Sequence, residues 1–148
     1  MTVCQLIYLS RATEKLSLRD TMDLVEQASV KNERAEITGL LCYGGGFFLQ
    51  VLEGDGDQIS QTFCRIARDP RHRDVRLIDF SVVQTRRFDD WSLHLINLDD
   101  PNRPEAMHRP PRFQRDRTHP FFSTDPQVAF WMLYDLKTRE LEKPKAPA

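Results

Sequence analysis

The stretch GFFLQVLEG, residues 46–54, contains the residue that decides how the rest of the chain is interpreted. Its aromatic and branched side chains are typical of a buried strand, yet Gln50 interrupts the apolar run between Leu49 and Val51. A buried amide without hydrogen-bond partners costs about 1–3 kcal/mol. Gln50 therefore either faces water or has polar partners inside the fold, and the strand pattern leaves both possibilities open.

Length and composition indicate one globular domain with a terminal extension. The chain has 148 residues, of which 40% are hydrophobic and 29% are charged. A net charge of −1 argues against a nucleic-acid partner, and no apolar run approaches the roughly 20 residues of a membrane span. Cys4, Cys42 and Cys64 lie far apart in apolar surroundings without a CxxC pair, which predicts buried reduced thiols and a cytoplasmic protein.

Secondary structure follows from the patterns on both sides of the opening stretch. The glycines at 44–46 predict a hairpin between the two strands of ITGLLCYGGGFFLQVLEG, because glycine tolerates the positive φ of a tight turn. Ser17 and Asp20 form a predicted capping box for a helix over residues 18–31, which Asn32 ends. A second helix is expected over residues 57–69, and further strands over 3–10, 75–84 and within 86–98.

The resulting order, β-α-β-β-α-β-β, predicts an α+β, ferredoxin-like fold with a mixed five-stranded sheet over residues 1–98. Its first and third strands should lie side by side at the centre, with both helices on one face. Residues 99–148 are expected to form a proline-rich linker and a C-terminal helix that begins at Asp125-Pro126. Val128, Met132 and Leu136 mark its apolar face, which should pack on the bare side of the sheet or on a partner chain.

This topology places Tyr8 and Gln50 on neighbouring strands, near Asn32 at the end of the first helix. A phenol and an amide in one pocket can exchange hydrogen bonds, because an amide both donates and accepts them. The alternative is that Gln50 points outward and Tyr8 only packs. The charged stretch RIARDPRH, residues 65–72, would suit a polar ligand beside a pocket and is otherwise typical of a solvated surface.

Four segments together resemble a known family. LIYLSRAT (6–13), Asn32 with the hairpin over 37–54, RIARDPRH (65–72) and RRFDDWSLHL (86–95) resemble the BLUF domain, a blue-light sensor that uses a flavin, in the right order and spacing. The resemblance covers roughly residues 2–98. It implies the ferredoxin-like fold derived above, with the flavin held between the two helices.

The resemblance also implies a role for each matching residue. Tyr8 would donate an electron and a proton to the photoexcited flavin, and Gln50 would bridge the two and then rearrange its hydrogen bonds. Trp91 and Leu93 would relay the change; position 93 is commonly methionine in the family, which puts the relay through Leu93 in doubt. Besides Tyr8 and Gln50, the residues implied in flavin binding are Leu24, Val25, Lys31, Asn32, Arg65, Ile66, Asp69, Arg71 and His72.

We therefore predict a blue-light photoreceptor of the short type, without enzymatic activity, that signals to a separate effector protein. FAD is the expected cofactor, with FMN and riboflavin as alternatives, and a homo-oligomer is expected. No metal is expected, because His72, His94, His108 and His119 lack ligand spacing. The alternatives are a light-independent flavin-binding or small-ligand module and an acylphosphatase-like enzyme, although SRATEK after the first strand lacks a glycine cradle.

Overall fold

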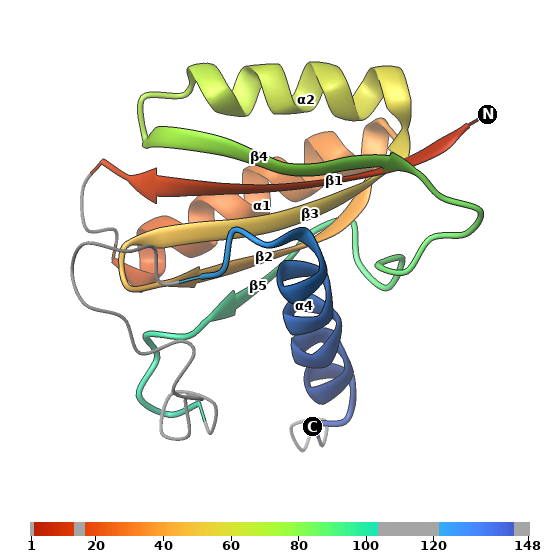
Figure 1. The fold of residues 1–148 in the computed structure, drawn as a ribbon. Helices are drawn as coiled ribbons and strands as arrows, with labels where there is room; N and C mark the ends of the chain where they lie inside the picture. The colour runs from red at the N-terminus through yellow and green to blue at the C-terminus, as the bar shows by residue number, and fades with distance from the viewer. Residues whose placement is uncertain (1, 14–16, 104–121, 144–148) are drawn as a thin grey trace.

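A computed structural model of the chain describes residues 2–13, 17–103 and 122–143. Its five strands form one sheet in the order β4-β1-β3-β2-β5 (Figure 1). The predicted ferredoxin-like fold is confirmed: β1 and β3 are central antiparallel neighbours, and the parallel pairing of β2 with β5 makes the sheet mixed. The elements are β1 Val3–Ala12, α1 Leu18–Arg34, β2 Thr38–Gly44, β3 Phe47–Asp55, α2 Gly56–Arg68, β4 His72–Val82, β5 His94–Asn97 and α4 Pro126–Leu141.

Local signals in the sequence account for the start of α1 and for the hairpin. The Ser17 hydroxyl accepts a hydrogen bond from the Asp20 backbone N–H at 3.0 Å, and the Asp20 carboxylate accepts one from the Ser17 N–H. Gly45 and Gly46 form the turn between β2 and β3 with φ of 59° and 82°. The predicted capping box and glycine turn are thus confirmed. Helix α1 extends to Arg34, beyond the expected end at Asn32.

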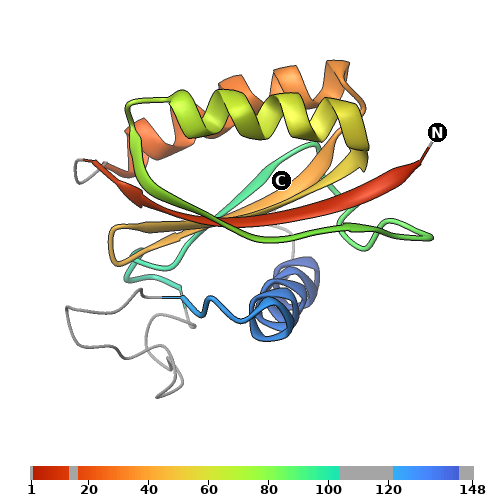
Figure 2. The ribbon, with the colours of Figure 1, turned by 45° about the horizontal axis from the view of Figure 1, so that its top comes forward.

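Both faces of the sheet are covered by helices. In Figure 2, α1 and α2 lie on one face and α4 crosses the other. Tyr8 and Leu6 of β1 pack on the helix pair, whereas Ile7 and Leu9 pack with α4. A strand buried on both sides needs apolar residues at consecutive positions, which is why β1 and β3 show an apolar run without alternation.

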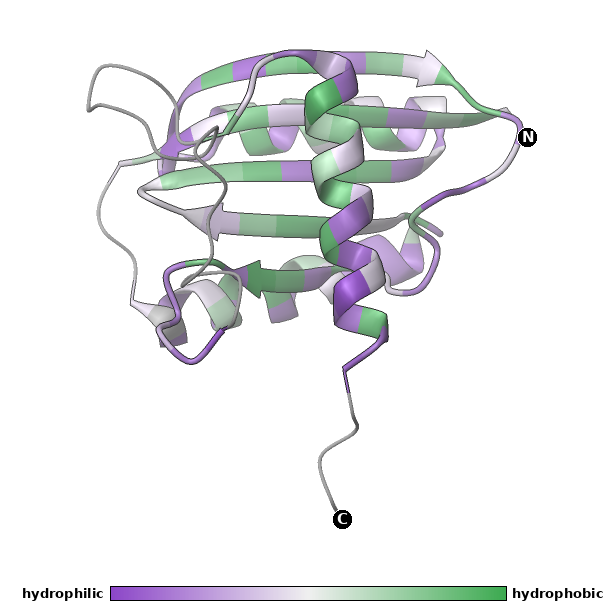
Figure 3. Cartoon of the chain, turned by 60° about the horizontal axis from the view of Figure 1, so that its bottom comes forward, coloured by the Kyte–Doolittle hydropathy of each residue, from purple (hydrophilic) through white to green (hydrophobic). Residues whose placement is uncertain are grey.

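Helix α4 begins where the sequence predicts, because the Asp125 carboxylate accepts hydrogen bonds from the N–H groups of residues 127 and 128. Two of the three predicted face residues, Met132 and Leu136, are buried, and the expectation for Val128 is wrong. Val128 is 39% exposed, and the residues that pack against the sheet are Ala129, Met132, Leu133 and Leu136. Figure 3 shows this helix crossing the strands, with its less polar half over the centre of the sheet.

A buried carboxylate fixes the segment between β4 and β5. Glu53 of β3 is fully buried, and it accepts hydrogen bonds from the Gln5 side chain and from the backbone N–H groups of Arg87 and Phe88. Phe88 is thereby held in the core, where its ring contacts Phe130 of α4 edge to face. These bonds offset the cost of removing the charge from water.

Several expectations on single residues have mixed outcomes. Cys4 and Cys42 are buried free thiols, but the expectation that Cys64 is buried is wrong, because it is exposed on α2.

No helix within the described ranges has the length and apolarity of a membrane span. In the same ranges no three potential metal ligands cluster. The remaining expectations, on His108, on His119 and on most of the predicted linker, fall in residues 104–121, outside the described part.

Leu49 tests the account of the core, because it is fully buried in the central strand β3. We expect Leu49→Ala to lower the free energy of unfolding by about 2–5 kcal/mol through lost burial and the cavity it leaves. Leu77→Ala is the matched control; Leu77 is 54% exposed on the edge strand β4, so its change should stay within about 0.5 kcal/mol. Urea denaturation measures both, and equal losses would contradict the account.

Candidate functional site

The centre of the site is a hydrogen bond between two paired strands. Tyr8 of β1 and Gln50 of β3 are direct partners in the antiparallel register, and the Tyr8 hydroxyl donates to Gln50 Oε1 at 2.5 Å. Both side chains point to the face that carries α1 and α2, and they are 1% and 4% exposed. Gln50 is therefore a buried amide with a phenol as one partner, which answers the question raised by the sequence.

The other end of the amide is open. Gln50 Nε2 has no hydrogen-bond acceptor among the described residues, and the side chain lines a cavity between α1 and α2. Asn32, buried in the last turn of α1, faces the same cavity. Its Nδ2 donates to the Ser92 backbone carbonyl at 2.9 Å, so its Oδ1 stays available to accept. The cavity thus offers one amide donor from the sheet and one amide acceptor from α1.

The helices supply the walls because of their periodicity. Residues three and four apart on a helix share a face. The cavity face of α1 comprises Leu24, Gln27, Ala28, Lys31 and Asn32, and that of α2 comprises Thr62, Arg65 and Ile66, with Asp69 just beyond. The Arg65 guanidinium donates to the Thr62 hydroxyl at 3.1 Å.

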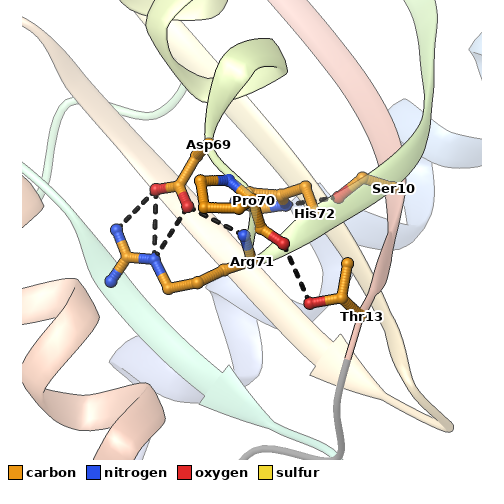
Figure 4. Close-up of polar contacts among 6 residues, drawn as sticks. All are labelled: Ser10, Thr13, Asp69, Pro70, Arg71 and His72. Atoms are coloured by element: carbon orange, nitrogen blue, oxygen red, sulfur yellow. Dashed lines mark hydrogen bonds and ion pairs between the residues drawn. The ribbon is translucent and has the colours of Figure 1, made fainter.

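The turn between α2 and β4 (Figure 4) contributes Asp69, Arg71 and His72 to the lining of the cavity. Arg71 forms an ion pair with Asp69, which also accepts from the Arg71 backbone N–H at 2.9 Å. The Thr13 hydroxyl donates to the Pro70 carbonyl at 3.0 Å and ties this turn to the end of β1. His72 is the first residue of β4, three positions before the expected start of that strand.

The titratable groups at the cavity are held in defined charge states. Burial, reinforced by the Asp69 carboxylate, raises the pKa of Tyr8 well above its usual value, so the phenol stays protonated and can donate. Burial lowers the pKa of His72, which is neutral near pH 7 and whose Nδ1 lies 2.8 Å from the Ser10 hydroxyl. Hydrogen bonds from Arg71 hold the pKa of Asp69 below its ordinary value.

The structure brings ten of the proposed cofactor-binding residues to this cavity and leaves out one. Val25 packs instead in a cluster with Leu41, Tyr43 and Leu93 beneath α1. Those at the cavity are Tyr8, Leu24, Lys31, Asn32, Gln50, Arg65, Ile66, Asp69, Arg71 and His72.

The two proposed relay residues, which directly precede β5, face opposite sides of the sheet. Leu93 is buried and forms part of the cavity wall. The Trp91 ring stacks on His94, with 4.3 Å between the ring centroids, and packs against the core cluster that includes α4. Leu93 is therefore the cavity residue of the pair, and Trp91 belongs to the opposite face.

Four cavity residues escaped the sequence interpretation. Gln27 and Ala28 precede Lys31 and Asn32 by one helical turn, and helical spacing from those residues was the available signal. Thr62 has the same relation to Arg65 and Ile66. Leu41 of β2 pairs directly with Gln50, but nothing in the sequence distinguishes it from any other core leucine.

Comparisons with known proteins agree with this geometry. The family model "Sensors of blue-light using FAD", BLUF, matches residues 3–94. The photoactivated adenylate cyclase subunit beta of Euglena longa is 36% identical over 93 residues, which are 62% of this chain and 11% of the relative. The chain thus spans about a tenth of the length of this curated relative.

Two solved structures extend the comparison. BlrB, a BLUF protein in its dark state, is 32% identical with a TM-score of 0.62, over 65% of this chain and 73% of that one. BlsA in its photo-activated state covers 99% of both chains with a TM-score of 0.75, and at 22% identity it supports the fold alone. With its sequence match, its sheet topology and its paired tyrosine and glutamine, the chain belongs to the BLUF family of flavin-based blue-light sensors.

Proposed function

We propose that this chain is a blue-light photoreceptor in which Tyr8 and Gln50 carry out the primary photochemistry. The observation that carries the proposal is the Tyr8–Gln50 hydrogen bond together with the open Gln50 Nε2 in the cavity. This arrangement supports the proposal that Gln50 bridges the phenol and a ring bound between α1 and α2. We do not assign the chain an enzymatic activity.

The donor set of the cavity fits a flavin. The polar edge of the isoalloxazine ring presents carbonyl acceptors and one N–H donor, which match Gln50 Nε2 and Asn32 Oδ1. Leu24 and Ile66 offer apolar surface from the two helices for the ring. We assign Arg65 to the polar edge of the ring beside Asn32, and Lys31, Asp69, Arg71 and His72 to the polar tail. FAD is the proposed ligand, and FMN or riboflavin would present the same ring.

When bound, the flavin absorbs blue light and supplies the oxidant. Tyr8 would give up an electron to the excited ring, and as its hydroxyl proton passes to Gln50 Oε1, Gln50 Nε2 would release a proton toward the ring, so that protons and charge balance. Gln50 then rotates or tautomerises, which exchanges the donor and acceptor ends of its amide. Tyr8 and Gln50 are both buried, so little water reaches the bond between them.

The signal is proposed to pass to a separate effector protein through a changed surface. Such signalling requires only that the effector bind the lit and dark conformations with different affinity. The buried thiols Cys4 and Cys42 fit a reducing compartment, and we place the protein in the cytoplasm. We further propose a homo-oligomer, for which the exposed Trp131 and Val128 of α4 offer apolar contact surface.

The absorption spectrum before and after blue light tests the function. We expect purified protein to show a flavin spectrum in the dark and a small, reversible shift to longer wavelength after illumination, because new hydrogen bonds to the ring lower its transition energy. A flavin spectrum that light leaves unchanged would identify a light-independent binding module instead. Protein that binds no flavin would refute the proposal altogether.

Substitutions at the centre of the site test the assigned roles. Tyr8→Phe removes the electron and proton donor, and Gln50→Leu removes the amide, so both should keep bound flavin and lose the light-induced shift. Gln27→Leu is the matched control, because Gln27 lines the same cavity without a bond to Tyr8; it should keep the shift. Difference spectroscopy on the flavin-loaded variants measures this, and a normal photocycle in either central variant would contradict the roles.

A further inference from the structure

A buried serine of β1 contacts the histidine that lines the flavin cavity. The Ser10 side chain is 1% exposed, and its Oγ lies 2.8 Å from Nδ1 of His72, the first residue of β4. Ser10 follows Tyr8 by two positions on β1, so both side chains point to the face of the sheet that carries α1 and α2. Figure 4 shows this contact between the two strands.

The surroundings of Ser10 determine which atom carries the proton of this hydrogen bond. Within the described part of the chain, Nδ1 of His72 is the one partner of the Ser10 hydroxyl. A buried hydroxyl that donates to nothing loses a hydrogen bond that it has in water, so the Ser10 O–H donates and Nδ1 accepts. Nδ1 accepts only when it carries no proton, and a neutral imidazole then carries its proton on Nε2.

The ring of His72 is also fixed in position and in charge. Its centroid lies 4.9 Å from that of Phe48 and 6.2 Å from that of Tyr8, which it meets edge to face at 74°. Burial lowers the pKa of His72, with the Arg71 guanidinium acting in the same direction and the Asp69 carboxylate against it. The neutral form therefore predominates near pH 7.

The second ring nitrogen of His72 is left for a ligand. Nε2 forms no hydrogen bond within the described residues, although the side chain lines the cavity. Among these residues, the only side-chain nitrogen or oxygen that is buried without a partner is Arg103 Nε, so His72 Nε2 is accessible. A neutral N–H at this position fits an oxygen acceptor and needs no countercharge.

We propose that Ser10 is a positioning residue that fixes His72 as the Nε2–H tautomer, so that His72 donates a hydrogen bond to an oxygen on the tail of the flavin. The inference rests on the proposed flavin-binding function and deepens it, because it names the donor that recognises the tail. The acceptor is an oxygen of the ribityl chain or of the phosphate. Without the Ser10 hydroxyl, the proton can move to Nδ1, and Nε2 then presents a lone pair that repels the same oxygen.

Nitrogen-15 NMR of the full chain with labelled histidine, before flavin is added, measures the tautomer. We expect His72 of the wild-type protein to carry its proton on Nε2, and Ser10→Ala to shift the population toward Nδ1–H. The His72 signals are those that disappear in His72→Ala. Ser81→Ala is the matched control, because it removes a hydroxyl of the same sheet that donates to Asp79 and does not line the cavity; it should leave the tautomer unchanged.

Binding of FMN and of riboflavin, followed by flavin fluorescence, measures the consequence. We expect Ser10→Ala to weaken FMN binding by about 2- to 10-fold, as for the loss of one neutral hydrogen bond. Because Ser10 acts through His72, it should have no further effect in the His72→Ala background. A loss confined to FMN identifies the phosphate as the acceptor, and an equal loss for riboflavin identifies the ribityl chain.

Ser10 could instead only support the packing of β1 and β4, and the same measurements separate the two roles. Purely structural support predicts an unchanged His72 tautomer and an affinity loss of the same size with and without His72. Either result overturns the inference and leaves flavin binding standing. Wild-type protein that binds neither FMN nor riboflavin overturns the proposed function and the inference together.

Discussion

The hydrogen bond between Tyr8 and Gln50 is the interaction on which the rest of the site depends. It joins two strands whose residues are direct partners, so the backbone ladder sets the separation of the two side chains. Helices cover both faces of the sheet, which keeps water from competing for either partner. The bond satisfies one end of a buried amide, and the open end faces the cavity. A ligand with an acceptor there would complete the set of partners.

The two faces of the sheet differ in structure, because one carries an open cavity and the other a closed core. The face under α1 and α2 carries the cavity, with open amide groups at Asn32 and Gln50. The face under α4 carries a closed core, the buried carboxylate of Glu53 and the partly buried carboxylate of Glu140, each with several partners. The short strand β5 belongs to both faces, because Leu93 just before it borders the cavity and His94 contacts α4.

Local signals made most of the fold predictable. The cap at Ser17, the turn at Gly45 and Gly46 and the cap at Asp125 each act within a few residues, and each appears where the sequence indicates. The apolar face of α4 was predicted correctly at Met132 and Leu136 but not at Val128, which is exposed although it is as apolar as its buried neighbours.

The site was predictable where the residue pattern is specific, as at Tyr8, Gln50 and Asn32. Helical spacing would also have given Gln27 and Thr62. The face of the sheet on which Trp91 lies could not be predicted from the sequence, because the segment that contains Trp91 lacks a helical or strand periodicity of apolar residues. The hydrogen bonds that Glu53 accepts could not be predicted from the sequence either. Two of its partners are the backbone N–H groups of Arg87 and Phe88, more than 30 residues away. Such contacts depend on how the chain returns to β3, which local patterns do not encode.

The central claim is that Gln50 changes its hydrogen bonds when the flavin absorbs light. An infrared difference spectrum between light and dark, recorded on protein with isotope-labelled glutamine side chains, tests it most directly. The account predicts amide bands that shift with the label in the wild-type protein and are absent from Gln50→Leu. A difference spectrum without any label-dependent band, in protein that still shows the flavin shift, would contradict it.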